Sequence, residues 1–328
     1  LGMTIALLRS QRTTTNNYSI DRVVSFCGQI RRNGSGVMQM GLKQKIEAKK
    51  FVILAEMEPP KGADVSRMVT NAQKVKGMVD AFVVPEMSNA VMRMSSLGGA
   101  MILKSKGLET VMQLNCRDRN RLALQADLLA ANGCGISSVM AVKGDDPGLG
   151  DHHQARGVYD LDLPALLAAI EGLQQGRDMA GIELSGAPEF LVGSTVEAGA
   201  RDKSPELILD EMNGLIQAGA RFFITPPLFD MTAIEPVWKK VDRDKTTVIP
   251  TVLLLKSLGM ARYIARNVGH TFIPDALIDR IQDAPDKVRE CIDIASETIR
   301  ALKKEGFGGV HIATIGWEDK LPEILKRT

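Results

Sequence analysis

Short runs of apolar residues alternate with segments of helical periodicity along most of the chain. From residue 51 onward, eight runs of four to six residues are almost entirely hydrophobic. Such short, unbroken runs are typical of parallel strands that are covered on both faces. The predicted strands are Phe51–Glu56, Ala81–Val84, Val111–Leu114, Ser138–Val142, Phe190–Gly193, Phe222–Thr225, Val248–Leu253 and Val310–Ala313.

Amphipathic segments separate the predicted strands. Apolar residues recur at helical spacing between Val65 and Val75, and again between Val288 and Leu302. Eight strand–helix units in one run predict an α/β fold, a single-domain (β/α)8 TIM barrel, with an open doubly wound sheet as the alternative. Further helices are predicted at Asn89–Lys104, Arg119–Asn132, Leu163–Gln174, Pro205–Ala218 and Thr232–Lys240.

The N-terminal segment differs from the rest of the chain. It is basic, rich in Ser, Thr, Asn and Gly, and has no acidic residue between Leu1 and Ile20. A signal peptide would need a continuous apolar stretch and a small-residue cleavage site, and neither is convincing here. We expect a disordered leader over residues 1–48 and the barrel over 49–328. A transit peptide is one alternative; a start at Met38 or Met40, with the preceding residues translated from upstream, is another.

Composition excludes several classes of protein. Lys and Arg number 41 against 39 Asp and Glu, a net charge of +2, and aromatic residues are scarce at 4%. This balance predicts neither a nucleic-acid nor a membrane partner. The four cysteines have no CxxC spacing, so neither a metal site nor a disulfide framework is expected. Because no apolar run of ~18 residues is present, the expected setting is cytoplasmic.

In a TIM barrel the reactive side chains lie at the C-terminal ends of strands. Glu56 closes the first predicted strand, just before a Pro-Pro corner. A carboxylate in a partly dry barrel mouth has a raised pKa and suits general acid catalysis. The alternative is that Glu56 merely bonds the backbone or a nearby arginine. Glu58, two residues on, is expected to point elsewhere because side chains alternate along an extended chain.

Other polar groups carry weaker signals. Lys143-Gly144-Asp145-Asp146-Pro147 follows the fourth predicted strand and could equally be an ordinary turn. Cys116 has no histidine at a comparable strand end and is interpreted as a buried structural thiol. The adjacent His152 and His153 are interpreted as solvated loop residues. Neither a Rossmann fingerprint nor a P-loop is present.

Three strand-end motifs together resemble the methylenetetrahydrofolate reductase family. They are Glu56-x-x-Pro-Pro-Lys, the segment Gln113–Asn120, and Gly144-Asp145-Asp146-Pro147, which stand in the family's order and spacing. The resemblance runs from about Phe51 to Thr328. It implies a barrel that holds a flavin, usually FAD, and that reduces 5,10-methylenetetrahydrofolate to 5-methyltetrahydrofolate with electrons from NADH or NADPH. Such an oxidoreductase serves one-carbon metabolism and methionine biosynthesis.

The resemblance also assigns roles to residues. Glu56 matches the general acid that protonates folate N10, and Asp145 matches the catalytic aspartate beside the flavin and the pterin. Gln113 and the Lys143 backbone would lie along the isoalloxazine. Substrate contacts are expected from Glu56, Asp145, Thr225, Tyr263 and Ile264, the last two lining the stacking face. The residues expected to bind the cofactor are Gln113, Asn115, Val142, Lys143, Gly144, Asp145, Tyr159, Thr195, Arg201 and Lys203.

The chain departs from the family pattern at several of these positions. Gln113 stands where better-known FAD enzymes have histidine, and Pro226 replaces a glutamine that meets the folate. Polar contacts to the dinucleotide align with Ile208 and Leu215. A phosphate contact would then need Arg201, Lys203 or the helix N-terminus at the N-cap Ser204. FAD is the expected cofactor and FMN the alternative.

Three readings of function therefore stay open. The favoured one is a flavin-dependent reductase that acts on methylenetetrahydrofolate and NAD(P)H. A pterin-binding barrel that passes a methyl group to a corrinoid protein is the second. The third is a partner-dependent subunit that takes electrons from another flavoprotein. A homo-oligomer is expected, with an electron-donating partner subunit as the alternative assembly.

Overall fold

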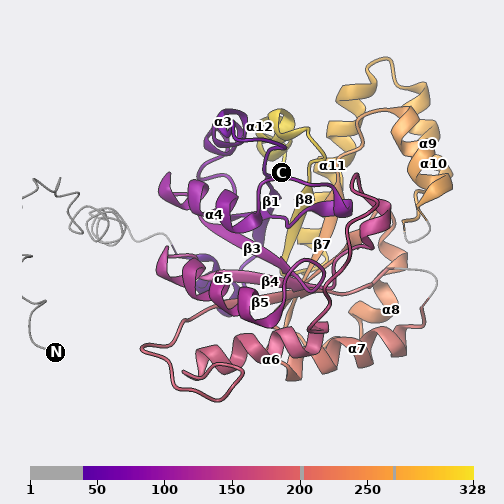
Figure 1. Ribbon diagram of the computed structural model, residues 1–328. Coiled ribbons are helices and arrows are strands. Elements are labelled where there is room, and N and C mark those ends of the chain that lie inside the picture. Colours follow the sequence, from indigo (N-terminus) through magenta and orange to yellow (C-terminus); the bar gives the residue numbers. More distant parts are fainter. Residues whose placement is uncertain (1–39, 200–202, 269–270) are drawn as a thin grey trace, which may run out of the picture. The chain divides into compact units, whose positions relative to one another are not determined.

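The computed structural model describes residues 40–199, 203–268 and 271–328. Eight parallel strands close into one barrel in chain order, so each strand pairs with the next and β8 pairs with β1 (Figure 1). This confirms the predicted (β/α)8 TIM barrel and excludes the open sheet. The strands are β1 Val52–Glu56, β2 Ala81–Val84, β3 Thr110–Asn115, β4 Ser138–Val142, β5 Leu191–Thr195, β6 Phe222–Pro227, β7 Thr247–Leu253 and β8 Gly309–Ala313.

Helices follow the strands around the barrel, and several begin where the sequence provides a capping side chain. Asn120, Asp162 and Ser204 each accept a hydrogen bond from the backbone N–H three residues on. The helices are α2 Leu42–Glu47, α3 Ser66–Lys74, α4 Ser96–Ser105, α5 Arg121–Gly133, α6 Leu163–Gln174, α7 Pro205–Gln217, α8 Glu235–Trp238, α9 Leu258–Asn267, α10 Asp275–Asp283, α11 Lys287–Lys304 and α12 Leu321–Lys326. Four 3-10 turns are η1 Ser88–Ala90, η2 Pro147–Leu149, η3 Met231–Ala233 and η4 Glu318–Lys320.

The predicted boundary between the leader and the barrel was wrong. Residues 42–47 were assigned to the leader, but they form α2, whose Leu42 and Ile46 are buried against the barrel interior. The helix is short and lysine-rich, and the residues before it are basic, so its amphipathic pattern was not recognised in the sequence. The rest of the predicted leader, residues 1–39, lies outside the described residues.

The predicted helix Asn89–Lys104 is two elements. The chain forms η1, runs without helix over residues 91–95, and starts α4 only at Ser96, capped by Ser95. Asn89 and Ala90 adopt positive φ, which no α-helix allows. Helices α10 and α12 were not predicted.

Apolar side chains inside the barrel form a small cluster of their own, separate from the larger one between barrel and helices. Phe222 fills the interior opposite Gly193 on the neighbouring strand, with which it is in register. A Cβ on Gly193 would lie only 2.1 Å from the Phe222 ring. Gly193 is therefore required by close packing.

We expect Gly193→Ala to lower the free energy of unfolding by about 1–3 kcal/mol, because the overpacked ring has nowhere to move. Gly214→Ala is the matched control: Gly214 lies in α7 with no atom within 4 Å of the added Cβ. Alanine in a helix should stabilise it by roughly 0.5–1 kcal/mol. Urea denaturation of both variants measures the difference. Equal stability of the two would contradict this account of the barrel interior.

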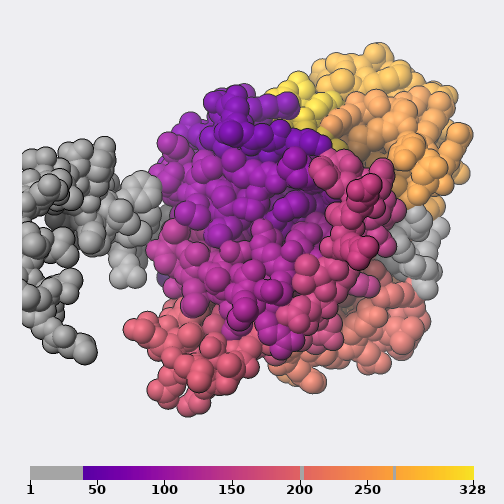
Figure 2. All heavy atoms as spheres, in the orientation of Figure 1, coloured from indigo at the N-terminus to yellow at the C-terminus, as the bar shows by residue number. Residues whose placement is uncertain are grey.

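A third cluster lies over the ends of β7 and β8. Helices α9 and α10 and the start of α11 pack there around Ile264, Ile281 and Cys291 (Figure 1). In Figure 2 these helices form the orange surface at the upper right. Within the described part of the chain, no helix is both long and apolar enough to cross a membrane.

Candidate active site

Glu56 ends β1 and is half-buried at the C-terminal mouth of the barrel. Burial and the nearby carboxylates of Glu58 and Glu318 raise its pKa to about 7, although backbone N–H groups of Ile315 and Thr314 oppose the rise. Both protonation states are therefore populated near neutral pH, as a general acid requires. Glu56 does bond the backbone, as the alternative interpretation held, but it pairs with no arginine among the described residues.

The two neighbouring carboxylates are held by cations. Glu58 turns toward Arg93, whose Nε lies 2.8 Å from Oε1. Glu318, 7% exposed, accepts a hydrogen bond from Thr314 Oγ1 at 3.0 Å and lies 3.6 Å from Arg67. Both carboxylates are engaged by arginines. They therefore raise the pKa of Glu56 through their negative charge and not through a hydrogen bond to it.

Arg117 joins the loops that follow β2, β3 and β4. Its side chain is buried, with Nε and Nη2 2.6 and 2.7 Å from the two carboxylate oxygens of Asp118. The same guanidinium donates to the backbone oxygens of Asp145 and Met87, each at 3.3 Å. One side chain therefore fixes three loops of the mouth, a role that sequence reasoning missed.

Asp145 lies at the rim, with its side chain exposed. Its Oδ2 accepts a hydrogen bond from the backbone N–H of Asn89 at 2.9 Å. Nearby, Asp151 accepts one from Met92 N–H and forms an ion pair with Lys61. The loops after β1, β2 and β4 are thus tied together beside Asp145.

Gln113 and Asn115 point inward from β3, but their hydrogen bonds differ. Gln113 Oε1 accepts from Glu86 N–H at 2.9 Å, whereas its Nε2 has no partner among the described residues. Asn115 is fully engaged, donating to Asp118 at 2.7 Å and to the Glu86 backbone at 3.2 Å. Gln113 is therefore available to a ligand, and Asn115 is a structural support.

Glu86 is a second residue that sequence reasoning left without a role. It is 4% exposed, accepts from Ser96 N–H and Oγ, and lies 3.3 Å from Arg119. A carboxylate two residues after a fully apolar strand was the available signal. It anchors α4 beneath the mouth.

The remaining predicted cofactor residues lie at the ends of β4 and β5. Val142 is half-buried and inward-facing, and Thr195 and Lys143 are exposed. Gly144 has φ +87°, and an added Cβ would lie 3.0 Å from the Arg117 Cβ. Tyr159 returns from the loop after β4, its hydroxyl 3.4 Å from the Asp145 backbone oxygen. These residues are brought together with Gln113 and Asp145.

The predicted substrate residues Thr225, Tyr263 and Ile264 differ in how accessible their side chains are. Thr225 is buried, and its hydroxyl donates to the Pro226 backbone at 2.8 Å. Ile264 packs into the third cluster, while Tyr263 is 64% exposed on the same helix. Their contact with substrate stays a prediction.

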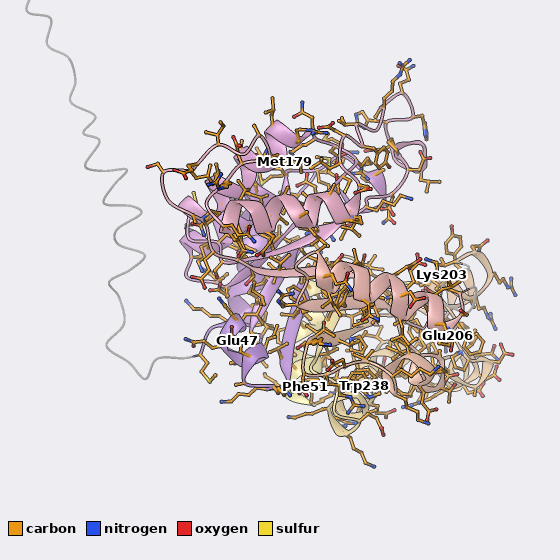
Figure 3. All side chains as sticks on the ribbon, turned by 90° about the horizontal axis from the view of Figure 1, so that it is seen from below. Glu47, Phe51, Met179, Lys203, Glu206 and Trp238 are labelled. Atoms are coloured by element: carbon orange, nitrogen blue, oxygen red, sulfur yellow. The ribbon has the colours of Figure 1, made fainter. Side chains whose placement is uncertain are left out.

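Lys203 already has two anionic partners. Its Nζ lies 2.7 Å from Glu197 and 3.0 Å from Glu211. Figure 3 shows Lys203 next to Glu206 at the start of α7. Arg201, the other predicted phosphate contact, lies outside the described residues.

Comparison with known proteins decides the family. A family model described as methylenetetrahydrofolate reductase matches residues 41–328. The chain belongs to the methylenetetrahydrofolate reductase family. Methylenetetrahydrofolate reductase 2 of Schizosaccharomyces pombe is 23% identical over 247 residues, 70% of this chain and 37% of that protein. A probable methylenetetrahydrofolate reductase (NADPH) of Caenorhabditis elegans is 25% identical over 245 residues, 71% of this chain and 34% of that protein. The chain matches about a third of the length of these relatives.

Solved structures support the fold of this family member. An uncharacterized Clostridium thermocellum protein that binds two copies of 5-methyl-5,6,7,8-tetrahydrofolic acid aligns with a TM-score of 0.56 and 14% identity, covering 87% of this chain and 97% of its own. An EDTA monooxygenase from Chelativorans aligns with a TM-score of 0.50 and 12% identity, covering 84% and 93%. At such identities, the likeness concerns the barrel alone.

The family implies a flavin. The residues at the ends of β3, β4 and β5 suit the ring system of a flavin. Gly144 brings the backbone against β3, while the Gln113 Nε2 and the exposed Thr195 offer polar groups beside the half-buried Val142. The residues predicted to hold the phosphates of FAD suit that role less well, because Glu197 and Glu211 already pair with Lys203. The described residues contain no group of three or more His, Cys, Asp or Glu that could hold a metal ion.

Cys116 is buried as expected. Burial raises the pKa of its thiol to about 11, so little thiolate forms near neutral pH. This agrees with the interpretation of Cys116 as a structural residue rather than a nucleophile.

Proposed function

We propose that this family member reduces 5,10-methylenetetrahydrofolate to 5-methyltetrahydrofolate, using a flavin that receives its electrons from NAD(P)H. The carrying observation is Glu56, a half-buried carboxyl at the end of β1 whose pKa of about 7 suits proton donation. The names of the relatives and the folate named for the Clostridium barrel support the substrate class.

The chain's own residues serve two needs of this reaction. The five-membered ring of the substrate must open to an N5 iminium ion, and Glu56 delivers the required proton to N10. Asp145 holds the amidine edge of the pterin and stabilises the developing cation. A flavin held beside Gln113 and Val142 would supply the hydride that completes the reduction. The loops tied by Arg117 keep the rim around Asp145 in place.

FAD is the proposed flavin, and FMN is the alternative that the ion pairs of Lys203 favour. The absorption spectrum of the purified protein tests whether a flavin is bound at all. Mass spectrometry of the flavin released by acid then identifies it. FMN alone would overturn the FAD assignment. A protein without flavin would favour the methyltransferase-type barrel.

The electron donor is tested separately from the flavin. Mixing the oxidised protein with NADH or NADPH in a stopped-flow instrument should bleach the flavin. Flavin that stays oxidised with both nucleotides but is bleached by dithionite would favour the partner-dependent subunit.

Asp145→Asn is expected to weaken folate binding by about tenfold, since a hydrogen bond to a charged group contributes roughly 1.5–3 kcal/mol. It should also raise the flavin midpoint potential, because a nearby anion opposes reduction of the ring. Potentiometry and folate titration measure both effects. Asp146→Asn is the control, because Asp146 caps the next turn through Gly148 N–H. Equal effects of the two variants would remove Asp145 from the site.

A further inference from the structure

Three neighbouring helices, α4, α5 and α6, cover one side of the barrel and expose almost no charge (Figure 1). The exposed residues of α4 are Met101 and Ser105, and those of α6 are Pro164 and Ala168. Arg121 is the one charged residue among the exposed residues of these three helices, all of which the structure describes, and a neighbouring aspartate pairs with it. A helix that faces water normally carries charged residues on its outer side. An uncharged outer side therefore indicates a surface that another protein covers.

Helix α7, the next helix along the chain, shows the usual charged pattern. Its exposed residues include the acids Glu206, Asp210 and Glu211. The uncharged surface therefore belongs to α4, α5 and α6 and is not a general property of the helices around this barrel. It continues onto the loop after α6, where Met179 is 38% exposed and its backbone N–H donates to Gln125 Oε1 of α5 at 2.9 Å.

Exposed residues of α5 recur at the spacing of a coiled coil. Leu122, Ala126, Leu129 and Gly133, here called the α5 row, follow one another at intervals of four, three and four residues. This is the spacing of the a and d positions, which form one seam along a helix. Large and small side chains alternate along the row. Leu122 is 73% exposed, and a Cβ added at Gly133 would meet no atom within 4 Å.

The α5 row is complementary to an antiparallel copy of itself. A two-fold axis that passes between Ala126 and Leu129 sets Leu122 of one copy opposite Gly133 of the other, and Leu129 opposite Ala126. Each leucine then faces a small residue, as knobs-into-holes packing requires. A closed two-fold interface uses the same surface on both copies, so any charge in it would face a like charge. The α5 row has none, and its self-association meets no such repulsion.

We propose that the α5 row is the interface with a second copy of this chain, whose own α5 packs antiparallel against it. The flanking helices α4 and α6 expose no charge that would oppose the approach. Helix α5 follows β3 and so begins at the C-terminal mouth of the barrel. An antiparallel pair of α5 helices therefore leaves the two mouths at opposite ends of the dimer, and neither copy covers the site of the other. The dimer does not depend on the proposed reaction.

Analytical ultracentrifugation of the full chain tests whether the dimer forms. We expect a dimer that dissociates on dilution. Leu122→Glu should weaken dimerisation by about tenfold or more, because the interface would bury a carboxylate opposite Gly133 with no cation to pair with it. Leu207→Glu is the matched control and should leave the dissociation constant unchanged. Leu207 is also a largely exposed leucine, at 58%, but it lies on the charged surface of α7.

Disulfide cross-linking tests the antiparallel register. The double variant Leu122→Cys/Gly133→Cys is made together with Cys27→Ser and Cys134→Ser, which leaves only the buried Cys116 and Cys291. The two new thiols cannot bond within one chain, because the helix separates them by about 16 Å. In the proposed register each new cysteine lies against the other new cysteine of the second copy. Mild oxidation should therefore give a covalent dimer from the double variant and little from either single variant.

Three outcomes overturn the proposal. The first is a chain that stays monomeric at every concentration, which would leave this surface to a different protein. The second is a dimer whose dissociation constant is the same in Leu122→Glu as in the wild type, which would place the interface elsewhere. The third is a covalent dimer that forms as readily from the single cysteine variants as from the double variant, since their like positions lie far apart in the antiparallel register. None of these measurements requires folate or a flavin.

Discussion

Replacing Glu56 with glutamine is expected to slow folate reduction by ~10²–10⁴-fold, the usual contribution of a general acid. Reduction of the flavin by its electron donor should stay near the wild-type rate, because hydride transfer to the flavin needs no proton on N10. Single-turnover kinetics measures the two half-reactions separately. In the wild type, folate reduction should fall as the pH rises through about 7, because it needs the protonated form of Glu56.

Glu58→Gln is the matched control for this result. It removes a carboxylate two residues away that is paired with Arg93 and that helps to raise the Glu56 pKa. We expect this variant to retain folate reduction at low pH and to lose it at a lower pH than the wild type. If Glu56→Gln keeps more than a small fraction of turnover while Glu58→Gln does not, the acid is Glu58.

Glu56 should also lower stability above neutral pH. Its folded-state pKa is raised from 4.5 to about 7, so between these values the folded protein binds more protons than the unfolded chain. Stability is therefore lost as the pH rises from 4.5 to about 7 and stays lower above it. At about 1.4 kcal/mol per pH unit, Glu56→Gln should stabilise the protein by up to about 3 kcal/mol at pH 8 and hardly at pH 4. Thermal unfolding at the two pH values measures the difference without any folate assay.

The strands could be predicted because each is a local feature. A parallel strand that is buried on both faces needs a short apolar run, and all eight runs were present in the sequence. Two short elements with few buried residues, α2 and η1, were misplaced. Helix α2 buries only Leu42 and Ile46, and η1 depends on positive φ at Asn89, which contacts with the loop after β4 stabilise.

Site residues could be placed from the sequence only where they stand at the end of a barrel strand. The sequence placed Glu56 and Gln113 on barrel strands, and both lie there in β1 and β3; their roles stay predictions. Arg117 was missed because its partners come from three loops that are distant in sequence. Thr225 and Lys203 looked available as polar residues, but only tertiary structure shows that Pro226 and two glutamates already engage them.

Replacing Arg117 is expected to have the second large effect, a loss of stability. Replacing it with methionine keeps most of the buried side-chain volume but breaks its paired bonds to Asp118 and leaves the backbone oxygens of Met87 and Asp145 without their donor. Breaking a buried ion pair by removing one partner costs about 3–5 kcal/mol. The lower end is expected here, because Asp118 is partly exposed and keeps its hydrogen bond from Asn115.

The matched control for Arg117→Met is Arg121→Met, four residues along the chain. Arg121 is half-exposed and pairs with Asp160 at 2.9 Å, so its loss should cost much less than the loss of Arg117. Urea denaturation gives the two free energies, and hydrogen exchange should show faster opening of residues 86–92 and 144–151 only in Arg117→Met. Because those loops hold Asp145 at the rim, folate affinity should fall together with their protection. Loops that stay protected in Arg117→Met would mean that the ties of Asp145 to Asn89 and of Asp151 to Lys61 are sufficient to hold the mouth.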